Sequence, residues 1–282
     1  MTQCLQSAMA KASQDLTAAG VEGASRDASL LMAFALGLEP HQISLRLNNS
    51  LDPAQEAAFS AALSLRLDRV PMSHILGYRD FYEHRFIVTP DVLDPRPDTE
   101  ALVSRALEYD FDNVLDLGTG SGCILLSLLA KNIYAQGIGV DQSAKAIAVA
   151  ERNARALELN TRSEFIVSDW FSSLPERRFD LIVSNPPYIH PNAMAGLSAE
   201  VLHEPELALT DQKDGLSHYR HIAKAAHSFL APKGRLVFEI GFDQGEAVSD
   251  ILTTQAYREI AVLPDLDGRA RVVTCLSPSR WW

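Results

Sequence analysis

The residues of this sequence best suited to chemistry are Asn185, Pro186, Pro187 and Tyr188, which follow an apolar run at 181–184. Two consecutive prolines cannot continue a strand ladder, so the chain must leave the sheet there as a stiff turn. The amide oxygen of Asn185 and the carbonyl of Pro186 can accept the two hydrogens of an –NH₂ group, and the Tyr188 ring can lie over its plane. The stretch therefore predicts a site for a flat, neutral, N–H-bearing group, with a proline-rich structural turn as the alternative.

A glycine-rich turn is the second candidate, between an apolar strand at 114–117 and an apolar helix at 123–129. It consists of Gly118, Thr119, Gly120, Ser121 and Gly122. Glycines let a ligand approach the backbone closely, and the following helix offers unpaired N–H groups at its start. The spacing is neither the G-x-G-x-x-G of a dinucleotide site nor a P-loop, and a tight structural turn is the alternative.

Acidic and aromatic side chains follow the next two strands. Asp141 stands about 20 residues after the glycine turn, where a carboxylate can hold ribose hydroxyls; the alternative is a cap for the helix that starts near Ser143. Asp169 and Trp170 end a third strand, where they can bind and cover an adenine; a loop aspartate and a core tryptophan are the alternative. Ligands of open α/β sheets sit outside the carboxyl ends of the strands, so these residues predict an adenosine pocket next to Asn185.

Alternating strand and helix patterns must position these residues. They predict strands at 114–117, 137–140, 165–167, 179–184 and 235–240, and helices at 99–107, 123–129, 144–157, 215–230 and 244–252. Asp98 and Thr99 offer caps for the first of these helices. Two further strands, 258–262 and 271–276, are joined by a link too short for a parallel crossover, so they must be antiparallel. The expected fold class is α/β, with a doubly wound, mostly parallel sheet.

The chain before this sheet shows a different pattern of apolar residues. Residues 1–70 show helical apolar stripes without a strand pattern, and they predict a helical bundle that recognises a partner. Residues 71–90 are rich in aromatic and β-branched residues, and Glu83-His84 between two short apolar runs predicts a hairpin linker. We therefore expect three parts, with the α/β domain at 91–282.

Composition describes an ordinary globular protein. Of 282 residues, 47% are hydrophobic and 22% are charged, and no window approaches the ~18 apolar residues of a membrane span. Cys4, Cys123 and Cys275 lack CxxC spacing, which argues against a zinc site or a disulfide framework and fits a reducing cytoplasm. The net charge of −11 has the wrong sign for non-specific nucleic-acid binding, and the histidines, His218 among them, show no metal-ligand spacing. We expect a cytoplasmic monomer without a metal.

The glycine turn, Asp141 and the tetrapeptide at 185–188 resemble the class I S-adenosylmethionine-dependent methyltransferases that act on a planar nitrogen. Within that class, the chain is similar over essentially its whole length to the bacterial peptide chain release factor glutamine methyltransferases. The stretches that carry this narrower resemblance are 27–31, 71–78, 88–93, 95–100, 239–241 and 244–245.

The resemblance implies a fold, a reaction and roles for residues. The family has an N-terminal helical bundle, a hairpin linker and a seven-stranded methyltransferase domain with its last strand antiparallel. It transfers a methyl group from S-adenosyl-L-methionine to the side-chain amide nitrogen (N5) of the glutamine in the Gly-Gly-Gln motif of class I release factors. By position, residues 118–122, Asp141, Trp170 and Asn185 would hold the cofactor beside Asp169. Residues 185–188 would bind the glutamine.

Two departures from the family pattern concern local geometry. Asp94 stands where an apolar residue is more usual before Pro-Arg-Pro, and Gln212-Lys213 stand where glycines are more usual. Three other functions stay open on the residues alone. They are methylation of a ribosomal-protein glutamine, methylation of an exocyclic adenine or guanine amine in a nucleic acid, and a non-catalytic binding module.

Overall fold

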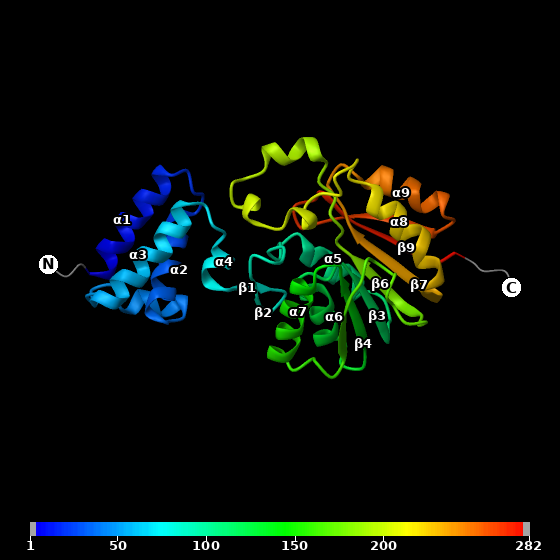
Figure 1. Ribbon diagram of the computed structural model, residues 1–282, viewed down its shortest axis with the longest axis horizontal. Helices are drawn as coiled ribbons and strands as arrows, with labels where there is room; N and C mark the ends of the chain where they lie inside the picture. Colours follow the sequence, from blue (N-terminus) through cyan, green and yellow to red (C-terminus); the bar gives the residue numbers. More distant parts are fainter. Residues whose placement is uncertain (1–3, 279–282) are drawn as a thin grey trace. The chain divides into compact units, whose positions relative to one another are not determined.

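The structure, a computed structural model, describes residues 4–278 and divides into two compact units. The first unit comprises the chain up to Gly77 together with Ser198–His203, and the second comprises Tyr78–Leu197 and the chain from Glu204 on. Figure 1 follows the chain through both units by colour. Each unit has a hydrophobic core of its own, as a folding domain requires.

The first unit is helical. Its elements are α1 (Leu5–Ala18), α2 (Ala24–Leu36), the 3-10 helix η1 (Pro40–Leu45), α3 (Pro53–Leu67) and α4 (Met72–Leu76). At the start of α3 the Asp52 carboxylate accepts the Gln55 N–H, and the Gln55 side chain accepts the Asp52 N–H, with Pro53 in the first turn. The core is formed by apolar side chains of these helices, among them Leu16, Leu31, Met32, Phe59 and Ala62.

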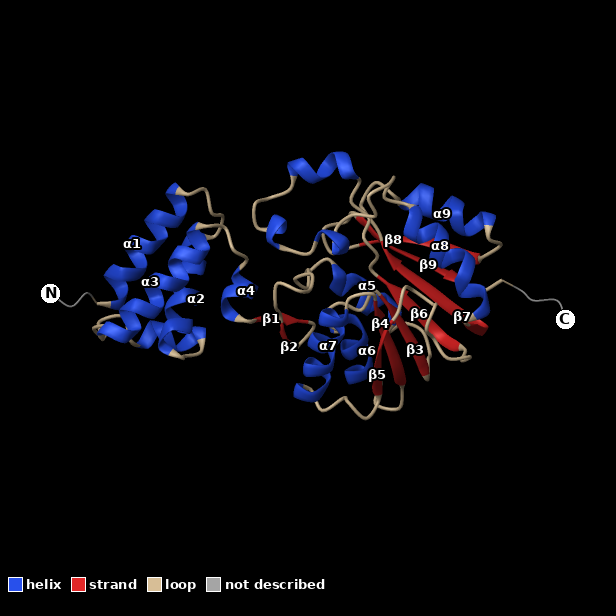
Figure 2. Ribbon diagram, viewed as in Figure 1, coloured by secondary structure: helices blue, strands red, loops and turns tan. Residues whose placement is uncertain are grey.

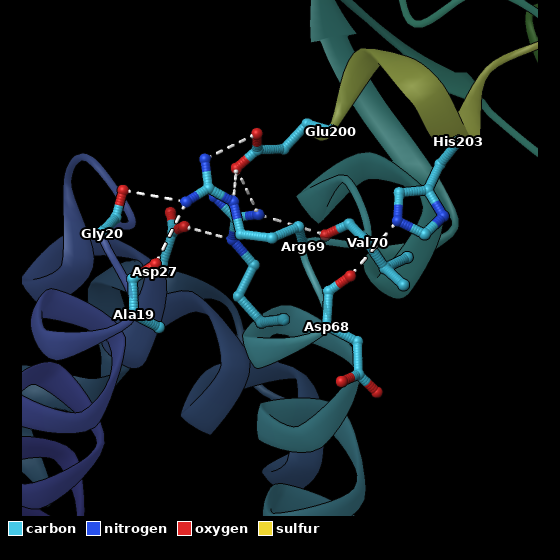
Figure 3. Close-up of polar contacts among 9 residues, drawn as sticks. Ala19, Gly20, Asp27, Asp68, Arg69, Val70, Glu200 and His203 are labelled. Carbon is cyan, nitrogen blue, oxygen red and sulfur yellow. Dashed lines mark hydrogen bonds and ion pairs between the residues drawn. The ribbon is translucent and has the colours of Figure 1, made fainter. Parts of the chain in front are cut away.

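The short segment Ser198–His203, distant in sequence, belongs to this helical unit (Figure 3). Arg66 Nη1 donates to Glu200 Oε1 at 3.0 Å, and Arg69 Nη2 donates to Glu200 Oε2 at 2.8 Å. Arg66 Nε also donates to Asp27 Oδ2 at 2.7 Å. The carboxylates of Asp27 and Glu200 thus neutralise the nearly buried guanidinium of Arg66, and Glu200 holds the segment in the unit.

The second unit opens with an antiparallel hairpin of β1 (Tyr78–Phe81) and β2 (His84–Ile87). The turn residues are Tyr82 and Glu83, with φ of 43° and 71°, and such left-handed values match the twist of the flanking strands. The turn expected at Glu83-His84 is therefore misplaced by one residue. Tyr and Glu are unusual at such a turn, so its exact position could not be predicted from the residue types.

A seven-stranded sheet forms the centre of the second unit (Figure 2). Its strands are β3 (Asn113–Leu117), β4 (Gln136–Asp141), β5 (Ser163–Val167), β6 (Phe179–Ser184), β7 (Leu230–Glu239), β8 (Arg258–Pro264) and β9 (Ala270–Leu276). Their order is β5-β4-β3-β6-β7-β9-β8, and β9 runs antiparallel to both of its neighbours. The predicted α/β class is confirmed, including the antiparallel last strand, because the short β8–β9 link leaves no room for a crossover.

Helices cover both faces of the sheet. They are α5 (Thr99–Ala106), α6 (Cys123–Lys131), α7 (Ala144–Ala156), α8 (Ser217–Ala225) and α9 (Gly245–Thr254). The 3-10 turns η2 (Pro191–Gly196), η4 (Glu206–Ala208) and η5 (Ala226–Ser228) belong to the same unit, whereas η3 (Val201–His203) belongs to the helical unit. Successive strand residues point to opposite faces. Val114 of β3 lies in one core with Leu125 of α6, whereas Leu115 lies in the other with Val248 of α9.

Two local expectations are wrong. The helix expected at 215–230 ends earlier, and β7 begins at Leu230 rather than at 235, because Pro232 and Gly234 inside the strand read as turn signals in the sequence. Asp98 precedes α5 but makes no side-chain cap hydrogen bond; its carboxylate lies 2.9 Å from Arg271 instead. Within residues 4–278, no helix is long and apolar enough to cross a bilayer.

Candidate functional site

The glycine turn leaves β3 in a left-handed conformation. Gly118, Gly120 and Gly122 have φ of 74°, 53° and 80°, values that cost about 1–2 kcal/mol for a residue with a Cβ. The N–H groups of Gly118 and Thr119 both donate to the Val140 carbonyl at 2.9 Å, which ties the turn to β4. Apart from Gly120 itself and its two chain neighbours, no atom of the described residues lies within 4 Å of the place where Gly120 would carry a Cβ, so its backbone is open to a ligand.

Asp141 ends β4 and faces this turn. Its Oδ2 accepts the Gly120 N–H at 3.0 Å, and its Oδ1 accepts the Ser143 N–H at 2.9 Å. Burial raises the pKa of this carboxyl, and the two N–H groups oppose the rise. The cap of α7 is Ser143, whose hydroxyl oxygen accepts the Ala146 N–H. Capping therefore does not occupy the aspartate side chain.

Trp170 follows β5 in a strained backbone conformation, with φ of 51°. Its carbonyl accepts the Ser168 hydroxyl at 2.9 Å, and its ring lies 3.8 Å from where a Cβ on Gly118 would stand. The His218 ring of α8 packs on the indole with centroids 4.9 Å apart. Burial lowers the pKa of His218, which keeps the imidazole neutral at neutral pH.

These strand ends surround an open cavity of about 870 Å³, a volume that includes the solvent at its mouth. The predicted residues that line it are Gly118, Gly120, Asp141, Asp169, Trp170, Asn185 and Pro187. Further walls of the cavity, which were not predicted from the sequence, are formed by Val92, Leu93, Pro205, Leu207, Ala208 and His218. These come from loops and a helix whose own patterns carry no ligand signal.

Five predicted site residues lie outside the lining of this cavity, namely Thr119, Ser121, Gly122, Pro186 and Tyr188. The Thr119 hydroxyl instead donates to Asp116 Oδ2 at 2.7 Å, and the Ser121 carbonyl accepts from Asn153 Nδ2 at 2.9 Å. These two residues hold the shape of the turn that the glycines present to the cavity.

The tip of β6 lies beside the end of β3. The buried Ser184 hydroxyl donates to the Leu117 carbonyl at 2.7 Å, where the two strands pair in parallel. Asn185 comes next and lines the cavity, and its Nδ2 donates to Thr99 Oγ1 at the start of α5 at 3.4 Å. This hydrogen bond engages the amide nitrogen of Asn185 and not its amide oxygen Oδ1.

Tyr188 is held at both ends. Its carbonyl accepts from Gln244 Nε2 at 3.1 Å, and its hydroxyl donates to Glu239 Oε1 at 3.4 Å. Burial, and after it the Glu239 charge, raises the pKa of Tyr188 above its ordinary value, so the phenol stays neutral. A Cβ on Gly215 would stand 2.6 Å from the Tyr188 carbonyl, so that position requires glycine.

Two fully buried acids lie in the same sheet, and neither was singled out as a site residue. Burial raises the pKa of Asp116 in β3 and of Glu239 in β7 to about 7. Residues 4–278 contain no group of three His, Cys, Asp or Glu side chains placed to hold a metal ion. Cys123 and Cys275 are buried free thiols, and burial raises the pKa of Cys123 to about 12.

The two departures from the family pattern, at Asp94 and at Gln212-Lys213, are accommodated by local contacts and backbone conformation. Asp94 is buried, with Arg79 at 3.7 Å and Arg96 at 3.9 Å from its carboxylate. Gln212 takes the left-handed φ of 55° that a glycine would adopt easily. The Asp211 carboxylate accepts three backbone N–H groups of the same loop, and this fixes its course.

Two protein-family models match the chain. The model described as PrmC N-terminal domain matches residues 7–77, and the model described as Methyltransferase small domain matches residues 91–212. Together the two matches cover the helical part of the chain and the strand ends around the cavity.

Curated relatives match over nearly the whole chain. A release factor glutamine methyltransferase from Cereibacter sphaeroides is 49% identical over 265 residues, which are 94% of this chain and 95% of that protein. One from Caulobacter vibrioides is 40% identical over 278 residues, or 97% and 96% of the two chains. Among solved structures, a methyltransferase from Pyrococcus furiosus has a TM-score of 0.54 at 14% identity, covering 69% of this chain and 89% of that one, and supports the fold alone.

Proposed function

The chain belongs to the family of release factor glutamine methyltransferases, and from this premise we propose that it methylates the side-chain amide nitrogen (N5) of the Gly-Gly-Gln glutamine in class I peptide chain release factors. The resemblance drawn from the sequence is confirmed by relatives at 49% and 40% identity. The observation that carries the proposal is the meeting of Asn185 with Gly120, Asp141 and Trp170 around one cavity.

The proposed methyl donor is S-adenosyl-L-methionine, which supplies a methyl group on a positively charged sulfur, already activated for transfer. The cavity fits it. Its walls include the carboxylates of Asp91, Asp141 and Asp169, and no lysine or arginine is among the lining residues of the described chain. Such walls suit a cationic ligand without a polyphosphate. We assign Asp141 to the ribose hydroxyls and Asp169 with Trp170 to the adenine.

Asn185 and its neighbours would bind the glutamine side chain. The Asn185 Oδ1 and the Pro186 carbonyl accept the two amide hydrogens, and Tyr188 packs beside them. Support comes from the Asn185 amide nitrogen, which is engaged by Thr99 and leaves Oδ1 for the substrate. Proline at 187 has no N–H that could compete for these acceptors.

The chemical difficulty lies in the substrate, because an amide nitrogen shares its lone pair with its carbonyl. Two acceptors on its hydrogens return electron density to nitrogen and stabilise the positive charge that builds during attack. The site then has to hold the nitrogen in line with the methyl group and exclude water. No strong base is required, since the proton leaves after transfer, when the nitrogen is far more acidic.

The helical unit would recognise the protein substrate. In domain terms, we propose a recognition domain at 1–70, a hairpin linker at 71–90 and a methyltransferase domain at 91–282. The helical unit exposes the large apolar side chains of Phe34 (45%) and Leu45 (85%), which suit a protein partner. We further propose that the protein acts as a cytoplasmic monomer, without direct binding of nucleic acid or membrane.

One labelling experiment tests the proposal against its alternatives. The protein is incubated with radiolabelled S-adenosyl-L-methionine and, separately, with a class I release factor, ribosomes or DNA. We expect the release factor to be labelled, and the label to be lost when the glutamine of its Gly-Gly-Gln motif is replaced by alanine. Label in a ribosomal protein or in DNA would favour the alternatives, although the net charge of −11 disfavours DNA.

A further inference from the structure

Glu239, the last residue of β7, is a buried carboxylate that the proposed reaction does not yet use. The residue is 1% exposed. Its Oε1 accepts the Tyr188 hydroxyl at 3.4 Å, whereas its Oε2 is buried and makes no hydrogen bond to any residue between 4 and 278. A buried carboxylate with an oxygen that accepts no hydrogen bond makes folding less favourable. Such a group therefore needs an explanation, and a role in function is one.

Charged and titratable groups face this carboxylate from several elements. Arg271 of β9 stabilises its charge and is itself paired with Asp98 at 2.9 Å, while Asp98 destabilises it. Tyr219 of α8 donates to the Glu239 backbone carbonyl at 2.9 Å, and Cys123 of α6 is close enough to respond to the charge. Arg271 is thus the cation near the carboxylate, and Asp98 largely neutralises the charge of Arg271.

Thr99 connects Glu239 to the tip of β6. It begins α5, it is 3% exposed, and its Oγ1 accepts from Asn185 Nδ2 at 3.4 Å. Burial raises the pKa of Glu239, and the Thr99 hydroxyl opposes this rise. A threonine hydroxyl has one hydrogen to donate. When that hydrogen points to the carboxylate, the lone pairs of Oγ1 face Asn185, which must turn its –NH₂ toward Thr99 and its Oδ1 away.

We propose that Glu239 is a positioning residue that sets the direction of the hydrogen bonds through Thr99 and thereby decides which end of the Asn185 amide faces the substrate. The inference rests on the proposed function, in which Asn185 Oδ1 accepts an amide hydrogen of the glutamine. Glu239 also anchors the Tyr188 hydroxyl, so one carboxylate serves both ends of the stretch 185–188. Both hydrogen bonds measure 3.4 Å, and such bonds commonly tighten when substrate binds.

Protonation of Glu239 removes this constraint. A carboxylic acid can donate its own hydrogen to Thr99 Oγ1, and the threonine hydrogen can then point to Asn185, whose Oδ1 would turn toward it. Burial raises the pKa of Glu239 to about 7, with Thr99 and Arg271 opposing the rise. The productive orientation is therefore gained as pH rises through about 7, and turnover rises with it.

The variant Glu239→Gln tests this, because glutamine keeps the shape of the side chain but replaces one acceptor by an –NH₂ donor. At pH 8 we expect kcat for methylation of the release factor to fall about 10–100-fold, as for loss of a group that orients a binding side chain, with KM for S-adenosyl-L-methionine within about twofold. The rise of wild-type kcat through pH 7 should be absent from the variant. An unchanged kcat with the wild-type pH profile would overturn the inference.

Thr99→Val and Thr99→Ser form a matched pair, since valine removes the hydroxyl at similar shape and serine keeps it. We expect the valine variant to lose about tenfold in kcat and the serine variant to retain most of it. Thr99→Val combined with Glu239→Gln should lose little more than Glu239→Gln alone, because both changes break one hydrogen-bond chain. Fully additive losses would contradict the shared chain.

Two controls separate this inference from folding and from the proposed function. Calorimetric binding of S-adenosyl-L-homocysteine and thermal unfolding report whether each variant is folded with an intact cofactor site. Wild-type protein that methylates no release factor would defeat the proposed function. Wild-type protein that does so while Glu239→Gln and Thr99→Val match it would defeat the positioning role alone.

Discussion

Glu200 of the helical unit and two acids of the sheet unit, Asp116 and Glu239, respond to burial in opposite ways. In the helical unit, burial acts to raise the pKa of Glu200, but hydrogen bonds from Arg69 and Arg66 outweigh it and hold the pKa at about 2. In the sheet unit, burial raises the pKa of Glu239 and of Asp116 to about 7. Neither of these two acids forms an ion pair within the described part of the chain.

This difference separates two uses of a buried acid. A carboxylate paired with arginine stays charged across the physiological range and serves structure. A carboxylate buried without a direct cation changes its charge near pH 7, and such groups gather at functional sites. The unpaired acids Asp116 and Glu239 lie in β3 and β7, near the strand ends that carry the cavity, whereas Glu200 belongs to the helical unit. Changes in the two units should therefore differ in kind.

Asn185→Ala should have the largest effect, and it should fall on the chemistry of the sheet unit. Loss of the Oδ1 acceptor should lower kcat about 10²–10³-fold, the cost of removing one preorganised polar group from a reacting centre, while cofactor binding weakens less. Labelled methyl transfer measures the first quantity and calorimetry the second. Asn192→Ala, at an exposed position of η2, is the matched control. Equal turnover in Asn185→Ala and wild type would falsify the role.

Glu239→Gln should also change how stability depends on pH. The folded-state pKa of about 7 lies above the ordinary value of 4.5, so ionisation costs the folded state free energy. Wild-type stability should therefore fall as pH rises from about 4.5 to about 7, by on the order of 3 kcal/mol. The variant lacks this loss, so its stability relative to wild type should grow between pH 5 and pH 8 in urea unfolding. A difference that stays constant between these pH values would speak against the raised pKa.

Asp141→Asn should weaken cofactor binding about 10–100-fold, because hydrogen bonds to a charged group contribute about 1.5–3 kcal/mol. Titration calorimetry with S-adenosyl-L-methionine measures the change. The exposed Asp267→Asn, in the link between β8 and β9, has the same chemistry without the cavity and should leave the affinity unchanged. If both variants bind alike, Asp141 does not hold the ribose.

Glu200→Gln should change the pH dependence of stability in the opposite direction to Glu239→Gln. Its folded-state pKa of about 2 lies below the ordinary value of 4.5, so the stability that it contributes is present above about pH 4.5 and is lost as pH falls toward 2. Because the group is partly exposed, solvent screening limits the effect to about 1 kcal/mol or less. Urea unfolding should show wild type ahead of the variant at pH 7 and the gap narrowing at pH 3. If the difference in stability between wild type and Glu200→Gln became larger at pH 3, the contrast drawn between Glu200 and Glu239 would be wrong.

Leu45→Asp should have the smallest effect and concern the choice of substrate. An added charge on the exposed η1 side chain should raise KM for intact release factor roughly threefold, well under 1 kcal/mol, and leave KM for a short Gly-Gly-Gln peptide unchanged. Leu266→Asp, on a fully exposed leucine of the sheet unit, is the control. The same rise in KM for peptide and protein would remove the recognition role from this surface.

Short-range patterns were enough to predict the strand ends that carry the candidate site. Residues 118–122, Asp141 and Asn185 each follow an apolar strand directly, and parallel pairing then brings these ends together. Packing between distant elements decided the rest. His218 and Leu207 reach the cavity from α8 and η4, whose own patterns predict a helix and a loop without chemistry.

The burial of Glu239 and the ion pairs of Glu200 could not be predicted from the sequence either. Glu239 reads as the polar end of an apolar strand, and it becomes a buried acid only through the packing of α5, α8 and β9 around it. Contiguous domains were expected, with residues 91–282 as one part. No apolar pattern marks Ser198–His203, and its place in the helical unit depends on contacts of Glu200 with Arg66 and Arg69, 134 and 131 residues away.

That interrupted course of the chain bears on how such a protein can be reshuffled in evolution. A recombination that grafted a foreign N-terminal module at the hairpin would import one of the two stretches of the helical unit and leave the other behind. The arginines of the imported module would then meet whatever residue the recipient carries at position 200, and without an acid there Asp27 alone would balance Arg66. Lineages that exchange this module must therefore inherit a compatible acid at the position of Glu200 as well.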